Sequence, residues 1–178
     1  MTNELFPSAA PDFTDPLGLL LACHQRILSH CETLEKAIAH ITEKGVDAEA
    51  RKALGQVHRY FSTAARHHHQ DEEEDLFPLL SRQSLKLADL VHRLRGDHKD
   101  MAAQWEALQP LLEKPDTIAE DQKTFAATVE GFNAAYRNHI KLEEAELLER
   151  AQHILSRAQL CDLGNRMAER RGQRPSYL

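Results

Sequence analysis

The chain has 178 residues, of which 42% are hydrophobic and 28% charged, and this is the composition of a soluble globular protein with one domain. Seven glycines and seven prolines are too few for a sandwich or barrel of many short strands, so the composition favours long helices. The net charge of −6 excludes a basic surface for polyanions, and we expect no nucleic-acid partner and no membrane partner.

The cysteines and the N-terminal segment indicate a cytoplasmic protein. Cys23, Cys31 and Cys161 are odd in number and lack CxxC spacing, which favours reduced thiols over disulfides or structural zinc. The N-terminal segment has no basic region followed by an apolar run, as a secretory signal would have. No stretch approaches the ~20 apolar residues that a membrane-spanning helix needs. The one unusual count is that of histidine, which occurs eleven times.

The first half of the chain predicts an arm and two helices. Residues 1–14 show no periodicity and are expected to form an extended arm. Asp15, which is followed by a proline, is a good helix start, and apolar residues then recur at alternating steps of three and four up to Gly45. A second amphipathic helix is expected to start at Asp47, and Pro78 marks either its end or a kink.

The second half predicts three more helices. One runs from Ser84 to the residue before Pro115, and another begins near Asp116. A short fifth helix over 156–171 is expected to pack across the others. The sequence therefore predicts an all-α fold, an antiparallel up-down-up-down four-helix bundle with a short C-terminal helix, in a single domain over 15–178.

Polar residues interrupt the apolar face of each long helix. The second and fourth helices each carry a histidine and a glutamate four residues apart, a spacing that places both on one face. The first and third helices carry one histidine each. The candidate site residues are His24, His68, Glu72, His98, His139 and Glu143. In an antiparallel bundle that rises ~1.5 Å per residue, they all fall within a turn or two of one level.

Six such side chains turned inward indicate a metal site. Each buried carboxylate without a partner costs several kcal/mol, and bound cations remove that cost. Six ligands are more than one tetrahedral zinc ion can bind, and this number suits two ions bridged by the carboxylates. The mixture of imidazole and carboxylate ligands disfavours calcium and magnesium, and iron, manganese and zinc remain as candidate metals. A neighbouring apolar layer would admit little beyond a diatomic molecule; it comprises Cys31, Phe61, Trp105 and Phe132.

Other polar residues near these motifs are expected to be structural or solvated. His67 and His69 are interpreted as solvated neighbours, although His69 with Glu73 keeps the same spacing of four. The acidic run 71–75 is expected to form an exposed face. The basic C-terminal residues are expected to form a solvated tail; they are Arg170, Arg171 and Arg174.

The segment His68–Pro78 resembles the HxxxEExxLFP signature of the hemerythrin-like (HHE cation-binding) family, and His139–Glu144 is similar to its second HxxxEE motif. His24 and His98 match its single histidines, and the resemblance covers roughly 17–154. It implies a non-haem, carboxylate-bridged centre of two iron ions that binds oxygen, nitric oxide or peroxide, or that senses redox state.

Three functions are compatible with this resemblance. The first is binding or sensing of a diatomic ligand or peroxide without turnover. The second is an enzyme that repairs iron–sulfur centres or counters nitrosative or oxidative stress with the same six ligands. The third is a metal-free interaction bundle. Oxygen carriers of the family have a second histidine four residues after the first on the third helix, where this chain has Ala102. A homo-oligomer is also compatible with the sequence.

Overall fold

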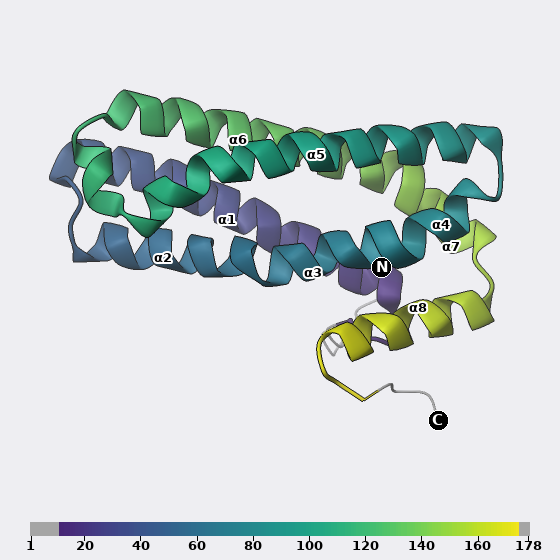
Figure 1. The fold of residues 1–178 in the computed structure, drawn as a ribbon. Coiled ribbons are helices and arrows are strands. Elements are labelled where there is room, and N and C mark those ends of the chain that lie inside the picture. Colours follow the sequence, from purple (N-terminus) through teal and green to yellow (C-terminus); the bar gives the residue numbers. More distant parts are fainter. Residues whose placement is uncertain (1–10, 175–178) are drawn as a thin grey trace, which may run out of the picture.

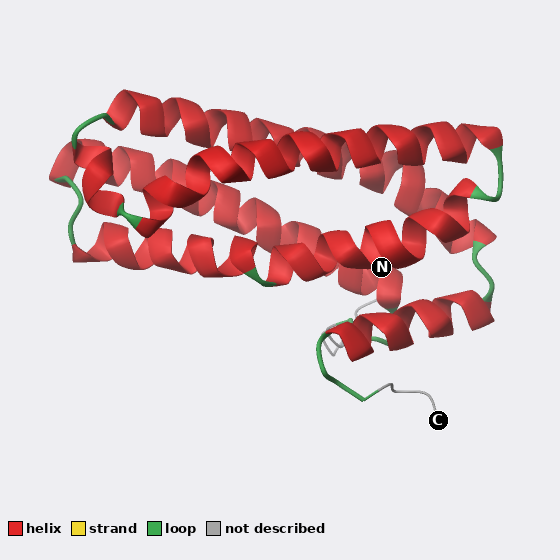
Figure 2. Cartoon of the chain, in the orientation of Figure 1, coloured by secondary structure: helices red, strands yellow, loops and turns green. Residues whose placement is uncertain are grey.

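The computed structural model describes residues 11–174, and every regular element among them is helical (Figures 1 and 2). Four long rods lie side by side, and successive rods are joined at alternate ends (Figure 1). The all-helical prediction is confirmed. Residues 1–10 of the expected arm, and residues 175–178, lie outside the described residues. Within 11–174, no helix combines the length and apolar character needed to cross a membrane.

The first and third rods begin and end as the sequence predicts. Helix α1 (Pro16–Lys44) starts after Asp15, whose carboxylate accepts a hydrogen bond from a first-turn N–H. It ends at Gly45, whose φ of 77° is a conformation that favours glycine. Helix α5 (Leu85–Glu113) starts after Ser84, whose hydroxyl caps it in the same way.

The second rod is interrupted, whereas the sequence predicted one helix from Asp47 to Pro78. Thr63 breaks it, and its hydroxyl donates to the carbonyl of Arg59, a bond that competes with the helical ladder. Ala65, two residues after the break, lies in the core. The rod comprises α2 (Ala48–Ser62), α3 (Ala64–Gln70), the π-helical turn η1 (Asp71–Leu76) and α4 (Phe77–Ser81).

The fourth rod begins later than the predicted start near Asp116. The carboxylate of Asp121 accepts hydrogen bonds from both the backbone N–H and the hydroxyl of Thr124, so it caps the helix. Asp116 is instead paired with Arg51. The segment comprises the 3₁₀ turn η2 (Pro115–Ala119), α6 (Gln122–Leu142), the π-helical turn η3 (Glu143–Leu148) and α7 (Glu149–Ile154).

Helix α8 (Arg157–Arg170) lies outside the four rods, against α1 and η1 (Figure 1). Ser156 begins it with a capping box, in which its side chain and that of Gln159 bind each other's backbone N–H groups. The predicted fifth helix is therefore present, and η1 is where it meets the second rod.

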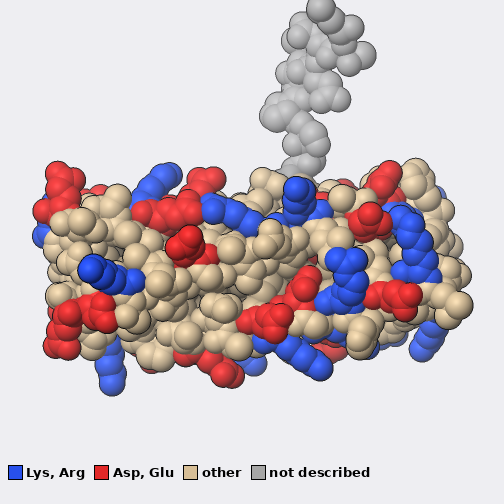
Figure 3. Space-filling view, turned by 90° about the horizontal axis from the view of Figure 1, so that it is seen from above, with Lys and Arg blue, Asp and Glu red and all other residues tan. Residues whose placement is uncertain are grey.

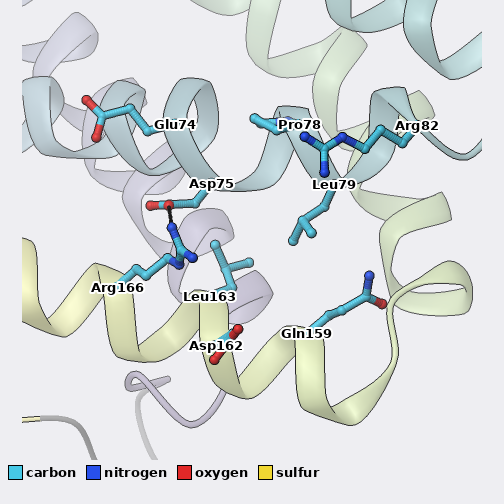
Figure 4. Close-up of a pocket in the computed structure, with 9 residues that line it drawn as sticks. All are labelled: Glu74, Asp75, Pro78, Leu79, Arg82, Gln159, Asp162, Leu163 and Arg166. Atoms are coloured by element: carbon cyan, nitrogen blue, oxygen red, sulfur yellow. Dashed lines mark hydrogen bonds and ion pairs between the residues drawn. The ribbon is translucent and has the colours of Figure 1, made fainter.

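Arg170 and Arg171, expected in a solvated tail, bind Asp71 and Asp75, expected on an exposed face. Both expectations are wrong for these four residues. Asp71 is fully buried and pairs with Arg170 and Arg171. Asp75 is 7% exposed and lies 2.8 Å from Arg170. Figure 4 shows Arg166 of α8 reaching the same Asp75. Carboxylates are buried here because guanidinium groups neutralise them. Arg174 is exposed, as expected.

The apolar core consists of two clusters with a polar layer between them. Phe61 and Phe132 belong to one cluster, and Phe77 and Leu147 to the other. Cys31, Phe61 and Phe132 are buried as expected, whereas Trp105 is only half-buried. The side of the molecule shown in Figure 3 carries acidic and basic side chains interspersed, with no broad field of one sign.

Gly164 in α8 provides a test of how the N-terminal segment packs. A Cβ added there would lie 1.9 Å from the carbonyl oxygen of Phe13. Gly164→Ala should therefore lower the free energy of unfolding by about 1–3 kcal/mol. Gly55 in α2 has nothing within 4 Å of the same position, so Gly55→Ala should raise it by about 1 kcal/mol. Urea unfolding of both variants tests this, and effects of equal sign would contradict the packing.

Candidate metal centre

Four of the six predicted site residues form one buried cluster. The ligand atoms of His24, His68, Glu72 and Glu143 all lie within 4.8 Å of one another, and all four side chains are buried. His68 Nε2 lies 2.8 Å from Glu72 Oε1, and His24 Nε2 lies 3.1 Å from Glu143 Oε2. Three rods contribute to this cluster.

The other two predicted residues adjoin it. His98 Nε2 lies 3.3 Å from Glu72 Oε2, and His139 Nε2 lies 3.4 Å from Glu143 Oε2. The two Nε2 atoms of His98 and His139 are 3.2 Å apart. The structure therefore brings all six side chains together in the polar layer between the two apolar clusters. Their role as metal ligands remains a prediction.

The carboxylates of the layer lack hydrogen bonds. Both carboxylate oxygens of Glu72 and both of Glu143 are buried and accept no hydrogen bond. The buried Nε2 of His24 also forms no hydrogen bond. The nitrogens and oxygens are close, but they do not have the alignment of N–H···O bonds. Ligand atoms about 2.0–2.2 Å from a shared ion lie within about 4.4 Å of each other, and the observed separations meet that limit. The residues therefore fit a metal centre.

Carboxylates outside the layer lie beside three of its four histidines and form hydrogen bonds with two of them, His24 and His98. Glu144 lies 3.0 Å from His24 Nδ1, Glu73 lies 2.8 Å from His98 Nδ1, and Asp97 lies 3.5 Å from His139 Nδ1. A proton on Nδ1 leaves the Nε2 lone pair facing inward. Sequence reasoning missed these three residues. The signal was present, because each directly follows or precedes a candidate ligand in the chain.

His68 is oriented differently. Its Nδ1 has no hydrogen-bond partner among oxygens and nitrogens, and the Cys23 thiol lies beside it. Burial raises the pKa of Cys23, but contact with His68 outweighs burial and lowers it. His68 therefore has the Cys23 thiol as a neighbour and no carboxylate at its Nδ1.

His69 is not the solvated neighbour that the sequence analysis expected. Its ring stacks on that of His98, with centroids 4.4 Å apart. Its Nε2 is buried without a hydrogen-bond partner. The alternative pairing of His69 with Glu73 does not form, since Glu73 faces His98 and Arg95. His67 is half-buried.

The charges of the layer are strongly coupled. Burial lowers the pKa of His24, but contacts with Glu143 and Glu72 outweigh burial and raise it to about 9. Burial is likewise outweighed at His98 by Glu72 and Glu73, which raise its pKa to about 9. Burial is also outweighed at the glutamates, because His68 and His24 hold the pKa of Glu72 well below its ordinary value, and His139 and His24 lower that of Glu143. Without metal, the layer is therefore held together by imidazolium and carboxylate.

A surface groove between α5 and α6 reaches the centre from one side. Asp97, Asn138 and His139 are among its lining residues. The His139 side chain is only 1% exposed, so the groove leaves the centre itself largely covered.

Comparisons with known proteins agree with this geometry. The family model described as the hemerythrin HHE cation binding domain matches residues 15–151. An uncharacterised protein of Haemophilus influenzae is 30% identical over 168 residues, which cover 94% of this chain and 96% of the relative. Helix α8 lies beyond the matched residues of the family model.

Metal uptake should release protons. His24 and His98 have pKa values of about 9, so both are protonated at pH 7 in the metal-free protein. Zinc binding at pH 7 should displace at least these two protons, and zinc affinity should rise towards pH 9. Calorimetry in buffers of different ionisation enthalpy measures the protons released, and heats independent of the buffer would contradict this charge state.

The same shifts predict how the stability of the metal-free protein depends on pH. Both folded-state pKa values lie above the ordinary histidine value of 6.5, so the two histidines stabilise the fold fully below that pH. This contribution should be lost as the pH rises through about 9, and unfolding curves without metal measure it.

Proposed function

The chain belongs to the hemerythrin HHE cation-binding domain family, and we propose that it holds two iron ions at which it binds oxygen, nitric oxide or peroxide. The observation that carries the proposal is the state of Glu72 and Glu143. Their four buried oxygens accept no hydrogen bond, and three of them lie 2.8–3.3 Å from imidazole nitrogens. Two cations of charge +2 would satisfy these carboxylates and the imidazole lone pairs together.

We assign the ligands to two ions by the distances between their atoms. His24 and His68 would hold one ion, and His98 and His139 the other. Glu72 faces both halves, because Oε1 lies 2.8 Å from His68 and Oε2 lies 3.3 Å from His98. Glu143 Oε2 lies near both His24 and His139. The two carboxylates are therefore placed to bridge the ions.

Iron is proposed on the chemistry of the donor set and on the family. Imidazole and carboxylate ligands suit iron, manganese and zinc, and disfavour calcium and magnesium. Iron would supply redox chemistry and coordination of small ligands. Manganese or zinc would occupy the same residues without changing the argument about them.

Binding or sensing is favoured over turnover by the surroundings of the site. The layer lies between two apolar clusters, and Phe61, Phe132 and Tyr136 pack together beside it. A diatomic molecule or peroxide fits such a site, whereas a bulky substrate does not. The three cysteines are free, which supports the proposed cytoplasmic location. An enzyme that repairs iron–sulfur centres would use the same residues, and it would require turnover.

Spectroscopy of the iron-loaded protein tests the proposal. The reduced protein should hold about two iron ions per chain, and anaerobic addition of nitric oxide, or of oxygen, should change its visible charge-transfer bands. Glu143→Gln should lower the iron content and weaken that response. Glu146→Gln is the matched control, because Glu146 lies in the same turn η3 with a side chain 44% exposed. If the visible spectrum of the iron-loaded protein does not change with either gas, the proposed binding of these ligands is contradicted.

A further inference from the structure

We propose that His69 is a seventh protein ligand, which gives the ion held by His98 and His139 a third imidazole. The inference rests on the proposed function, since it assigns a further residue to the same centre. The six-ligand arrangement does not use His69, and the matching motifs of the sequence do not include it.

The position of His69 places its ring at the edge of the polar layer. It follows His68 in α3, the seven-residue helix between the break at Thr63 and the π turn η1. Its ring lies between those of His98 and Tyr136, with centroid separations of 4.4 and 5.8 Å. These two rings restrict where the imidazole can move.

The ring nitrogens of His69 reach the ligand atoms of the centre. One of them, with ligand atoms of Glu72 and His98, forms a group whose members all lie within 4.8 Å of one another. Nε2 of His69 is buried without a hydrogen-bond partner, which is unfavourable for a polar atom unless an ion or proton satisfies it.

The third rod has no residue that could take this place. Ala102, four residues after His98, is exposed, while Met101 is the buried neighbour. Helix α5 therefore supplies one imidazole to the layer, and the second rod supplies two, His68 and His69, to different halves. The two ions would then be unequal, with two imidazoles on one and three on the other.

Histidine-ring NMR of the zinc-loaded protein tests the assignment. Two equivalents of zinc are added to metal-free protein labelled with ¹⁵N in its histidines, and long-range ¹H–¹⁵N spectra identify which ring nitrogens bind. We expect five rings to acquire a metal-bound nitrogen: His24, His68, His69, His98 and His139. Four bound rings without His69 would overturn the inference and leave the proposed centre intact. No bound ring among the five would overturn the centre itself.

A variant that keeps the ring stack separates ligation from packing. His69→Phe retains an aromatic ring against His98 and Tyr136 but has no nitrogen. In chelator competition, this variant should bind one of the two zinc ions at least about tenfold more weakly and the other with unchanged affinity. His67→Phe, a substitution at the half-buried neighbouring histidine, should leave both unchanged. Wild-type affinity for both zinc ions in His69→Phe would contradict a ligand role.

Discussion

The structure depends on the burial of two carboxylates, Glu72 and Glu143, in a layer that separates two apolar clusters. An isolated buried carboxylate is too costly to persist, so its surroundings must supply positive charge. In the metal-free protein that charge comes from imidazolium groups such as those of His24 and His98. The same nitrogens become ligands once a cation replaces the protons, so one layer accounts for both stability and metal binding.

The elements around the layer position it. Each π turn coincides with a motif glutamate, since η1 includes Glu72 and η3 begins at Glu143. Such turns are rare and often mark functional sites. Asp71, next to Glu72, is tied to Arg170 and Arg171 at the end of α8. That helix lies beyond the residues matched by the family model, and its arginines support the turn that carries Glu72.

Much of this arrangement could be predicted from the sequence, because periodicity determines which faces are buried. The spacing of His68 and Glu72, and the caps at Asp15 and Ser84, follow from local rules. The break at Thr63 and the two π turns could not be predicted, since no proline or glycine marks them and tertiary packing decides them. The stacking of His69 on His98 and the burial of Asp71 by α8 involve elements distant in the sequence, so both needed the three-dimensional structure.

Anomalous X-ray scattering from crystals of the iron-loaded protein tests the central claim most directly. At the iron absorption edge, two peaks should appear inside the polar layer, one between His24 and His68 and the other between His98 and His139, with Glu72 and Glu143 contacting both. A layer without anomalous density, or iron found only at surface carboxylates, would contradict the account.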